Sequence, residues 1–521
     1  MDAQRPSHEA QGTGPSGRWA AAAIVAAAVV VFAAGVRGKV VVGDECYHFM
    51  FARAWSEAGL ADRPAFNPLY GSGDPPGYYY VTGPLWPMGL ALVWDVTGVA
   101  QWSAQAYQAG FYALALAMVY AGARRRLGPR GGMAALLAAI SVPMLAAFSV
   151  LLYTDVAATA LAATAMVLLL DRRHFWAGAA LGLAYLTKRH AVFLAGPMVL
   201  WVVWEKGTAR ERLGRVAAML APMALVALPN ALWQRSHIPA AADPTSAGYV
   251  LGRLGLLFSP YAKPSSLLSP ADLAKYFGAV VPLAVAAATV RRVWQREDRG
   301  PWVAVGLYVA ATVLFFTLDT DVRYLMPAAP VVAVVAARGL EGWWRRRWVL
   351  AVLAAAAFAH LGATAVLVGG ARRLTPGQEA VFAYLEESTP EGSLVLYPSE
   401  AMTAETGRPV VWAHLVDPET GKRNAGRLLA TFSDAKLGAV LSANGIRYVC
   451  VEEGRIVPDG EAGRYVGFPR SLVERMGSLE FLEEVRGEWP GVRLFRFVDS
   501  AGGPGEAPSA EGADESPAEK P

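Results

Sequence analysis

Apolar runs without acidic or basic side chains recur along the sequence, and they restrict its fold more than any other feature. Ala20–Val36, Val281–Val290 and Ala351–Gly370 are such runs, interrupted only by His360. The hydrocarbon core of a bilayer is about 30 Å thick, so a helix needs about 20 apolar residues to cross it. Only 17% of the residues are charged, against about 25% in ordinary soluble proteins. We therefore predict a polytopic membrane protein and exclude a soluble multidomain enzyme, a disordered chain and a disulfide scaffold.

The charge and cysteine content exclude further classes. The arginine clusters are short and lie beside apolar runs instead of forming one basic face, which argues against nucleic-acid binding. Cys46 and Cys450 are too few for a disulfide framework or a cysteine metal site, and two isolated thiols are favoured over a bridge. Arg18 precedes an apolar stretch that could be a signal peptide. That stretch is longer than a usual signal sequence and lacks a clear cleavage site, so we expect a retained first span.

Eleven segments are predicted to span the membrane. They are 19–41, 104–122, 132–151, 156–170, 174–187, 190–205, 216–233, 276–290, 301–318, 324–338 and 348–369. Segment 78–97 is apolar enough to be a twelfth, but it is aromatic-rich and contains Pro84 and Pro87. If it does not span, the loops on one side hold 18 Lys and Arg and the longer opposite loops hold nine. The positive-inside rule therefore places 78–97 along the outer interface and the N-terminus in the cytoplasm.

The composition divides the chain into four parts. They are a disordered cytoplasmic tail at 1–18, a transmembrane module at 19–370, an extracytoplasmic α/β domain at 371–498 and a disordered tail at 499–521. The α/β assignment rests on strand-like runs such as 446–451 that alternate with helix-like stretches such as 377–387. The predicted fold class is thus an all-α polytopic membrane protein of about 11 transmembrane helices with a C-terminal α/β domain.

Polar residues near the predicted outer face are the candidates for chemistry, because polar groups at membrane depth usually face protein or a water-filled cavity. Asp44 and Glu45 follow the first span, with His48 close behind. A carboxylate near a low-dielectric surface can serve as a general base, although an isolated Asp-Glu pair more often caps a helix. Asp74–Tyr80 opens the interfacial segment with two prolines and three tyrosines. Alone it predicts only an aromatic membrane belt.

Two more clusters lie on the same predicted side. Asp155 lies between two predicted spans that are joined by almost no loop. Capping of the following helix and a role in substrate binding or catalysis are equally good explanations for a carboxylate there. Lys188, Arg189 and His190 form a cationic group on the side that is otherwise poor in cations. Such a group suits a phosphate, with snorkelling anchors as the alternative. A fifth cluster of mixed charge contains Asp321, Arg323 and Tyr324.

The order of these motifs resembles that of the GT-C glycosyltransferases, membrane enzymes that use lipid-phosphate-linked sugars. Asp44–His48, Asp74–Tyr79 and Leu152–Asp155 resemble the Asp-Glu…His, Thr-Pro-Pro-Gly-Leu-Tyr and Tyr-Tyr-Thr-Asp motifs of dolichyl-phosphate-glucose α-1,2-glucosyltransferases. Arg323–Pro327 is close to the Arg-Tyr-Leu-Pro pattern of the protein O-mannosyltransferase and aminoarabinose transferase group. The resemblance covers roughly residues 19–340.

The resemblance implies an inverting hexosyltransferase that moves a sugar from a polyprenyl (dolichyl-type) monophosphate to a glycan, lipid or protein acceptor outside the cytoplasm. The expected catalytic carboxylates are Asp44, as the general base, Glu45 and Asp155. The expected substrate-binding residues are His48, Pro76, Tyr79, Lys188, Arg189, His190, Asp321, Arg323 and Tyr324.

Two other classes were weighed against an enzyme. A transporter or flippase of lipid-linked sugars could use the same charged groups, but transporters usually show repeated halves and we find no repeat of fixed period. A scaffold for the C-terminal domain would leave the carboxylates near the membrane unexplained. No metal site is assigned, although the three carboxylates could supply oxygen ligands to a divalent cation. The motifs do not specify the sugar or the acceptor.

Overall fold

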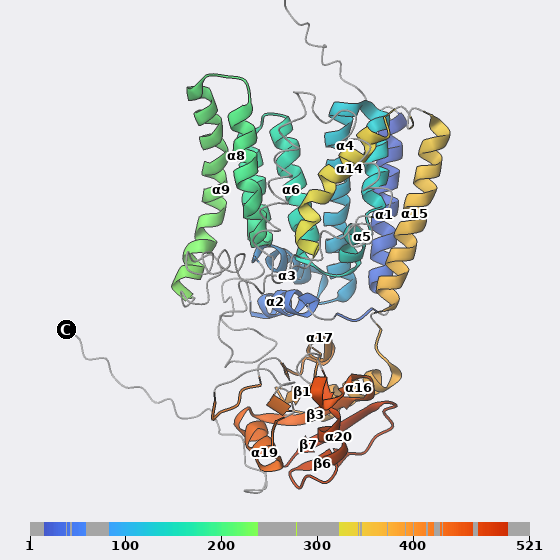
Figure 1. Cartoon of the computed structure of the whole chain (residues 1–521), viewed down its shortest axis with the longest axis vertical. Helices are drawn as coiled ribbons and strands as arrows, with labels where there is room; N and C mark the ends of the chain where they lie inside the picture. The colour runs from blue at the N-terminus through green and yellow to red at the C-terminus, as the bar shows by residue number, and fades with distance from the viewer. Residues whose placement is uncertain are drawn as a thin grey trace, which may run out of the picture. The chain divides into compact units, whose positions relative to one another are not determined.

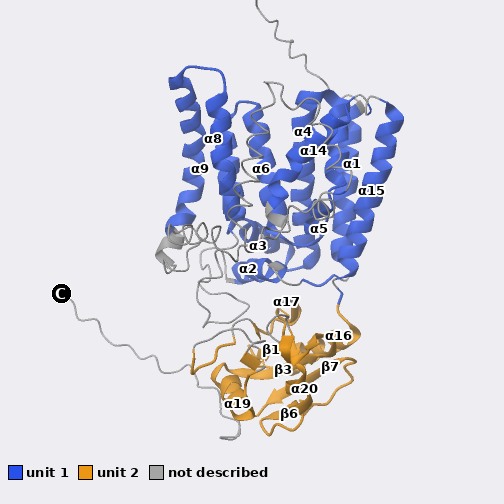
Figure 2. Ribbon diagram, in the orientation of Figure 1, with its two compact units in different colours: residues 1–373 blue, residues 374–521 orange. Residues whose placement is uncertain are grey.

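The computed structural model divides into two compact units, Met1–Arg373 and Leu374–Pro521 (Figure 2). In the first unit the structure describes residues 15–37, 39–41, 44–58, 83–237, 278, 322–341, 343, 346–371 and 373. In the second it describes 374–390, 392–399, 401–412, 415–420, 428–429, 431–461 and 467–498. The predicted tail 499–521, most of the tail 1–18, and the predicted spans 301–318 and (except Gly278) 276–290 lie outside the described residues.

The regular elements of the first unit are helices in the part that the structure describes (Figure 1). They are α1 (Pro15–Val36), α2 (Asp44–Ala58), α3 (Leu85–Thr97), α4 (Gln101–Ile140), α5 (Pro143–Val150), α6 (Thr154–Leu170), α7 (His174–Thr187), η2 (Arg189–Leu194), α8 (Ala195–Trp204), α9 (Ala209–His237), η6 (Val322–Ala328), α14 (Ala329–Gly339) and α15 (Arg347–Gly370). The long helices run side by side, and the shorter α2 and α3 lie at one end of them (Figure 1). The predicted interfacial position of segment 78–97, of which α3 is the larger part, stays a prediction.

Glycine and proline interrupt the longest helix. In α4, Gly128 has φ 75° and ψ 179° and precedes Pro129, so the helix is kinked between the predicted spans 104–122 and 132–151. A second break separates α4 from α5, and the two helices are bent by 59°. Pro143 begins α5, because proline fits the first turn of a helix and not its interior. Segment 132–151 is therefore two short helices and not one straight span.

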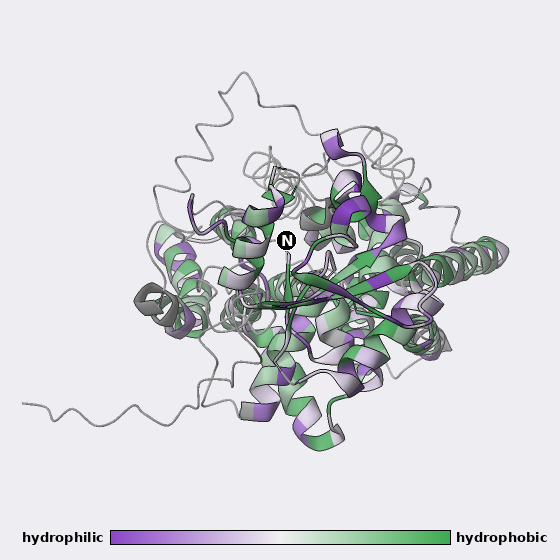
Figure 3. Cartoon of the chain, turned by 90° about the horizontal axis from the view of Figure 1, so that it is seen from below, coloured by the Kyte–Doolittle hydropathy of each residue, from purple (hydrophilic) through white to green (hydrophobic). Residues whose placement is uncertain are grey.

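Three described helices are long and apolar enough to cross a membrane alone, namely Ser16–Val36, Ala209–Leu232 and Arg347–Gly370. The bent pair of α4 and α5 is a fourth candidate, while α6, η2 with α8, and Leu325–Gly339 are shorter apolar helices. Hydrophobic residues lie along most of the helices (Figure 3). Leu225 in α9 and Leu367 in α15 are each 72% exposed, as expected of side chains that face lipid. A multi-pass membrane protein follows, and the count of eleven stays a prediction.

Small residues let these helices approach closely. A Cβ atom on Gly178 of α7 would lie 1.8 Å from the carbonyl oxygen of Met219 in α9. One on Gly369 of α15 would lie 2.8 Å from the carbonyl oxygen of Ala34 in α1. In a membrane, where apolar burial drives helix association only weakly, such close backbone contact is the usual source of packing energy.

The second unit is an α/β fold with a five-stranded sheet. Its elements are α16 (Pro376–Ser388), β1 (Leu394–Leu396), α17 (Ala401–Thr406), β2 (Val410–Val411), α19 (Asp434–Ala443), β3 (Ile446–Glu452), η7 (Glu453–Arg455), β4 (Ile456–Val457), η8 (Asp459–Glu461), β5 (Phe468–Pro469), α20 (Arg470–Met476), β6 (Leu482–Val485) and β7 (Val492–Phe497). The strand order is β2-β1-β3-β7-β6, and β4 pairs with β5 separately. The pairs β1–β2 and β1–β3 are parallel, whereas β7 is antiparallel to β3 and β6.

The sheet of this unit carries buried side chains on both faces. Val449 of β3 pairs with Leu396 of β1 and Phe495 of β7, and all three are buried with α19 and α20. On the other face, Val395 and Cys450 are buried in the cluster that includes α16. A hydrophobic core of its own therefore holds this unit together.

Candidate active site

A buried ion pair holds the beginning of α2. Lys39 Nζ pairs with Glu45 Oε2, and both side chains are 0% exposed. The same Oε2 accepts a hydrogen bond from the Leu152 N–H at 3.1 Å. A buried carboxylate needs a cation and hydrogen bonds, and these contacts fix Glu45 beside the turn that precedes α6. The predicted cluster around Asp44 and Glu45 is therefore in contact with the predicted cluster Leu152–Asp155.

Aromatic rings connect α2, α3 and the same turn. The His48 ring lies 5.7 Å from that of Trp86 in α3 and 6.4 Å from that of Tyr153, between ring centroids. His48 and Trp86 are both buried. The predicted substrate-binding residue His48 is thus placed between α3 and the Tyr153 turn.

A second buried ion pair joins Asp155 to the predicted cationic cluster of Lys188, Arg189 and His190. Lys188 Nζ donates a hydrogen bond to Asp155 Oδ2, and the two side chains are 3% and 0% exposed. Asp155 lies in the first turn of α6 and Lys188 caps the end of α7, so each charge suits the dipole of its own helix. Asp155 Oδ1 is buried and has no hydrogen-bond partner among the described residues. This carboxylate oxygen could therefore accept a hydrogen bond from a ligand hydroxyl group.

Arg189 and His190 extend the cationic end of this pair. They are the first residues of η2, and they are 8% and 6% exposed. A snorkelling side chain keeps its charged head in water, whereas Lys188 and Arg189 are enclosed by protein. Their burial argues against the anchor alternative and places two cationic residues, consecutive in the chain, in the interior.

Gln108 of α4, which the sequence analysis did not single out, holds the turn before α6. Its Nε2 donates hydrogen bonds to the carbonyl oxygens of Leu151 and Tyr153 at 3.2 and 2.8 Å. Its Oε1 accepts a hydrogen bond from Trp86 Nε1 at 2.9 Å. One amide therefore holds Trp86 and Tyr153, whose rings lie near His48.

Two other glutamines of α4 make similar contacts. Gln105 Nε2 donates to the carbonyl oxygen of Ser149 at 2.8 Å, and Gln101 Nε2 donates to that of Lys39. Gln101, Gln105 and Gln108 are spaced by four and three residues, which places them on one face of a helix. These three glutamines lie on one face in the mainly apolar first part of α4, and this spacing was the sequence signal that could have revealed them.

The described part of segment 78–97 contacts the residue before Lys188. The Gly83 N–H donates a hydrogen bond to the carbonyl oxygen of Thr187 at 3.1 Å. A Cβ atom at Gly83 would lie 1.8 Å from the carbonyl oxygen of Leu186, so only glycine allows this approach. The chain that leads into α3 is thereby fixed next to Lys188.

The other predicted site residues are not placed by the structure. Asp44 begins α2, but its side chain lies outside the described residues. The backbones of Arg323 and Tyr324 belong to η6, and their side chains are likewise not described. Residues that lie wholly outside the described part are Pro76, Tyr79 and Asp321.

The assembled site combines three buried cations, Lys39, Lys188 and Arg189, with the carboxylates of Glu45 and Asp155. In a low-dielectric interior these charges act strongly on any ionic group that enters. The adjacent Lys188 and Arg189 suit a phosphate, while Asp155 suits a hydroxyl group. Among the described residues, no three His, Cys, Asp or Glu side chains gather to hold a metal ion.

Comparison with known proteins identifies the architecture. Residues 81–233, which include Asp155 and Lys188, match the family model of dolichyl-phosphate-mannose-protein mannosyltransferases. The structure of ArnT from Cupriavidus metallidurans bound to undecaprenyl phosphate is similar, with a TM-score of 0.65 and 16% identity over 94% of this chain and 99% of that chain. The chain has the GT-C glycosyltransferase fold. The predicted resemblance to the GT-C glycosyltransferases is thus confirmed.

Other GT-C structures are similar over most of the chain. The oligosaccharyltransferase of Archaeoglobus fulgidus gives a TM-score of 0.64 and 15% identity, over 89% of this chain and 73% of that chain. The mycobacterial arabinofuranosyltransferase AftD gives 0.52 and 15%, over 92% of this chain and 40% of that chain. No curated protein sequence matches the chain.

Proposed function

We propose that this chain is an integral membrane glycosyltransferase that transfers a sugar from a polyprenyl monophosphate to an acceptor on the extracytoplasmic face. The observation that carries the proposal is the buried cluster of Lys188, Asp155 and Arg189 in a chain with the GT-C fold. The similar structures include ArnT bound to undecaprenyl phosphate and an Archaeoglobus fulgidus oligosaccharyltransferase in complex with an inhibitory peptide and dolichol phosphate. A flippase is not supported, because the matching family and these structures are transferases.

The donor phosphate is assigned to Lys188 and Arg189, with Arg323 as a third cation. The isoprenoid tail lies between helices, which explains why an enzyme that acts on polar sugars resides in a membrane. As the bond between the sugar and the phosphate breaks, negative charge builds up on the leaving phosphate. Fixed cations that are already in place stabilise this charge, and they do so most strongly where water is excluded.

The general base is assigned to Asp44. Glu45, its neighbour in the chain, already pairs with Lys39 and accepts the Leu152 N–H. A proton added to Glu45 would remove the charge that holds Lys39 in the interior. Glu45 is therefore assigned to positioning the beginning of α2, while Asp155 and His48 orient the sugar or the acceptor.

The reaction follows from these assignments as one displacement. The acceptor hydroxyl oxygen attacks the anomeric carbon, and its proton passes to the Asp44 carboxylate. The bond from the anomeric carbon to the phosphate oxygen breaks, and the electron pair leaves with the polyprenyl phosphate. A single displacement inverts the configuration, so a β-linked hexose donor gives an α-linked product.

The sidedness of the enzyme follows from the charge distribution. The loops rich in Arg and Lys are assigned to the cytoplasm by the positive-inside rule, and the end of the first unit that carries the site is assigned to the opposite side. The N-terminus is then cytoplasmic, and the α/β unit at 371–498 is extracytoplasmic.

The direct test incubates the purified protein with a panel of radiolabelled polyprenyl-phosphate sugars and a membrane extract as the source of acceptor. We expect label from at least one donor to move to a new product, with polyprenyl phosphate released. If every donor stays intact while the protein moves it between the leaflets of liposomes, the chain is a flippase and the proposal fails.

A further inference from the structure

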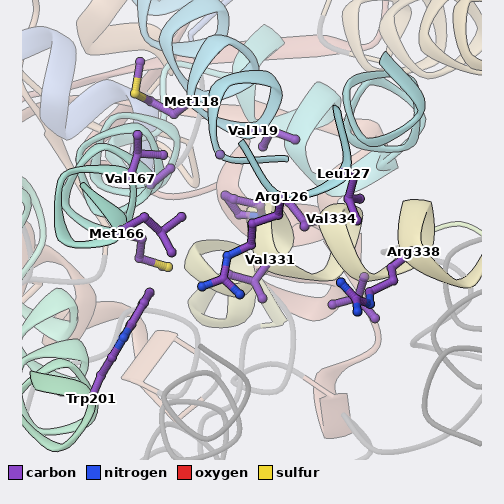
Figure 4. A pocket seen from close by; sticks show the side chains of 15 residues that line it. Met118, Val119, Arg126, Leu127, Met166, Val167, Trp201, Val331, Val334 and Arg338 are labelled. Carbon is purple, nitrogen blue, oxygen red and sulfur yellow. The ribbon is translucent and has the colours of Figure 1, made fainter. Parts of the chain in front are cut away.

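An apolar cavity of about 90 Å³ lies between α4, α6, α8 and α14, away from the buried ion pairs. Figure 4 shows the side chains that surround it. Met118, Met166, Trp201 and Val331 form apolar walls, and two arginines from different helices, Arg126 and Arg338, also line it.

The cavity lies toward the other end of the helices from the candidate active site. Asp155 is the second residue of α6, and Met166 is eleven residues further on, which corresponds to about 16 Å along the axis. In α4, Arg126 follows Gln108 by 18 residues, or about 27 Å. By the positive-inside rule this end faces the cytoplasm, so the cavity is separate from the proposed transfer site.

The surroundings of the cavity are strongly cationic. Arg124, Arg125, Arg126 and Arg130 all lie near the kink in α4. The carboxylate of Asp171 pairs with Arg125 at 2.8 Å. Basic pockets between transmembrane helices on the cytoplasmic side are suited to anionic lipid headgroups.

The walls indicate what kind of molecule enters. A sugar or a nucleotide would lose its hydrogen bonds to water in a cavity with apolar walls, which is costly. A hydrocarbon chain loses none, and guanidinium groups bind phosphate well. We propose that the cavity takes part of one acyl chain of an anionic phospholipid of the cytoplasmic leaflet, with the lipid phosphate bound by Arg126 and Arg338.

The test measures lipid binding and not sugar transfer, so its outcome is independent of the proposed enzyme activity. The purified, delipidated protein is titrated with phosphatidylglycerol or phosphatidylcholine, and bound lipid is counted by native mass spectrometry. We expect tighter binding of phosphatidylglycerol, reduced at least about tenfold in the Arg126→Gln/Arg338→Gln variant, because bonds to charged groups are lost. Arg125→Gln is the matched control, since Arg125 does not line the cavity, and it should bind as the wild type does.

Two further measurements test the acyl chain. Ala163, which also lines the cavity, is replaced by Phe to fill the space, and Ala163→Phe should lose phosphatidylglycerol binding while both arginines remain. Inorganic phosphate at millimolar concentration should not displace the lipid from the wild type. Equal binding of the two lipids, displacement by inorganic phosphate, or full binding by Ala163→Phe would each overturn the proposal. The tests with inorganic phosphate and with Ala163→Phe remain informative even if the arginine variant does not fold.

Discussion

Two lysine–carboxylate pairs are enclosed by protein at one end of the first unit, where a lone charge would be unstable. Lys39 pairs with Glu45, and Lys188 pairs with Asp155. A buried ion pair often contributes no more stability than apolar side chains of similar volume. The two ion pairs therefore indicate a role in positioning site residues or binding substrate. Within each pair, neither charge is stable in the interior without the other.

Removing one partner should be strongly destabilising. In Lys39→Met the Glu45 carboxylate keeps its buried position without its lysine, and breaking such a pair typically costs about 3–5 kcal/mol. We expect a clear fall in the thermal unfolding temperature of the purified protein, partly recovered in Lys39→Met/Glu45→Gln because the buried charge is then gone. An unfolding temperature equal to that of the wild type in the single variant would contradict the pairing.

The cations assigned to the phosphate can be tested separately. Arg189→Gln removes one charged group from the proposed donor site, and a hydrogen bond to a charged group is worth about 1.5–3 kcal/mol. We expect the affinity for polyprenyl phosphate, measured by displacement of a labelled lipid, to fall by about tenfold or more. Lys188→Gln/Arg189→Gln should weaken binding further, and unchanged affinity in both variants would show that these residues do not bind the donor.

At the scale of the elements, glycine allows α7 to pack closely on α9, and Gly178 makes the tightest contact. A Cβ atom on Gly178 would meet the carbonyl oxygen of Met219 at 1.8 Å, whereas one on Gly214 of α9 meets no atom within 4 Å. We expect Gly178→Ala to destabilise the protein by about 1–3 kcal/mol, as overpacking usually does. Gly214→Ala should be neutral or slightly stabilising, because alanine is the better helix former. Equal unfolding temperatures for the two variants would contradict this packing.

Several elements could be predicted from local sequence because local rules determine them. Thr375 and Gln378 form a capping box at the beginning of α16, and the apolar run at 446–451 forms most of β3. The antiparallel strand β6 (Leu482–Val485) was not predicted. Its sequence Leu-Glu-Glu-Val has few apolar residues, and only pairing with β7 makes it a strand.

The candidate site was predictable only in part. The motif order indicated that Glu45, Asp155 and Lys188 belong together, but not which charges pair. Lys39 was counted within the first span, although Glu45 is its partner. Gln108 was missed because its contacts depend on how α3 and the Tyr153 turn pack, and no local pattern reports such long-range contacts.

At the scale of the whole molecule, the topology can be tested by thiol labelling. The two native cysteines are buried, and burial also raises the pKa of the Cys450 thiol, so both should react slowly. In intact cells, Arg130→Cys beside the α4 kink should be protected from an impermeant thiol reagent, because we assign it to the cytoplasm. Thr97→Cys at the end of α3 should be labelled. The reverse pattern would overturn the sidedness and every assignment that depends on it.

The central claim is that a carboxylate at the beginning of α2 activates the acceptor for transfer. Asn is nearly isosteric with Asp but cannot take up the proton, and loss of a general base typically lowers the rate by about 100- to 10,000-fold. The deciding measurement is sugar transfer by purified wild type, Asp44→Asn and Glu45→Gln at saturating polyprenyl-phosphate donor. We predict that Asp44→Asn folds, binds the donor and loses transfer, while Glu45→Gln loses less. Wild-type turnover in Asp44→Asn would contradict the account.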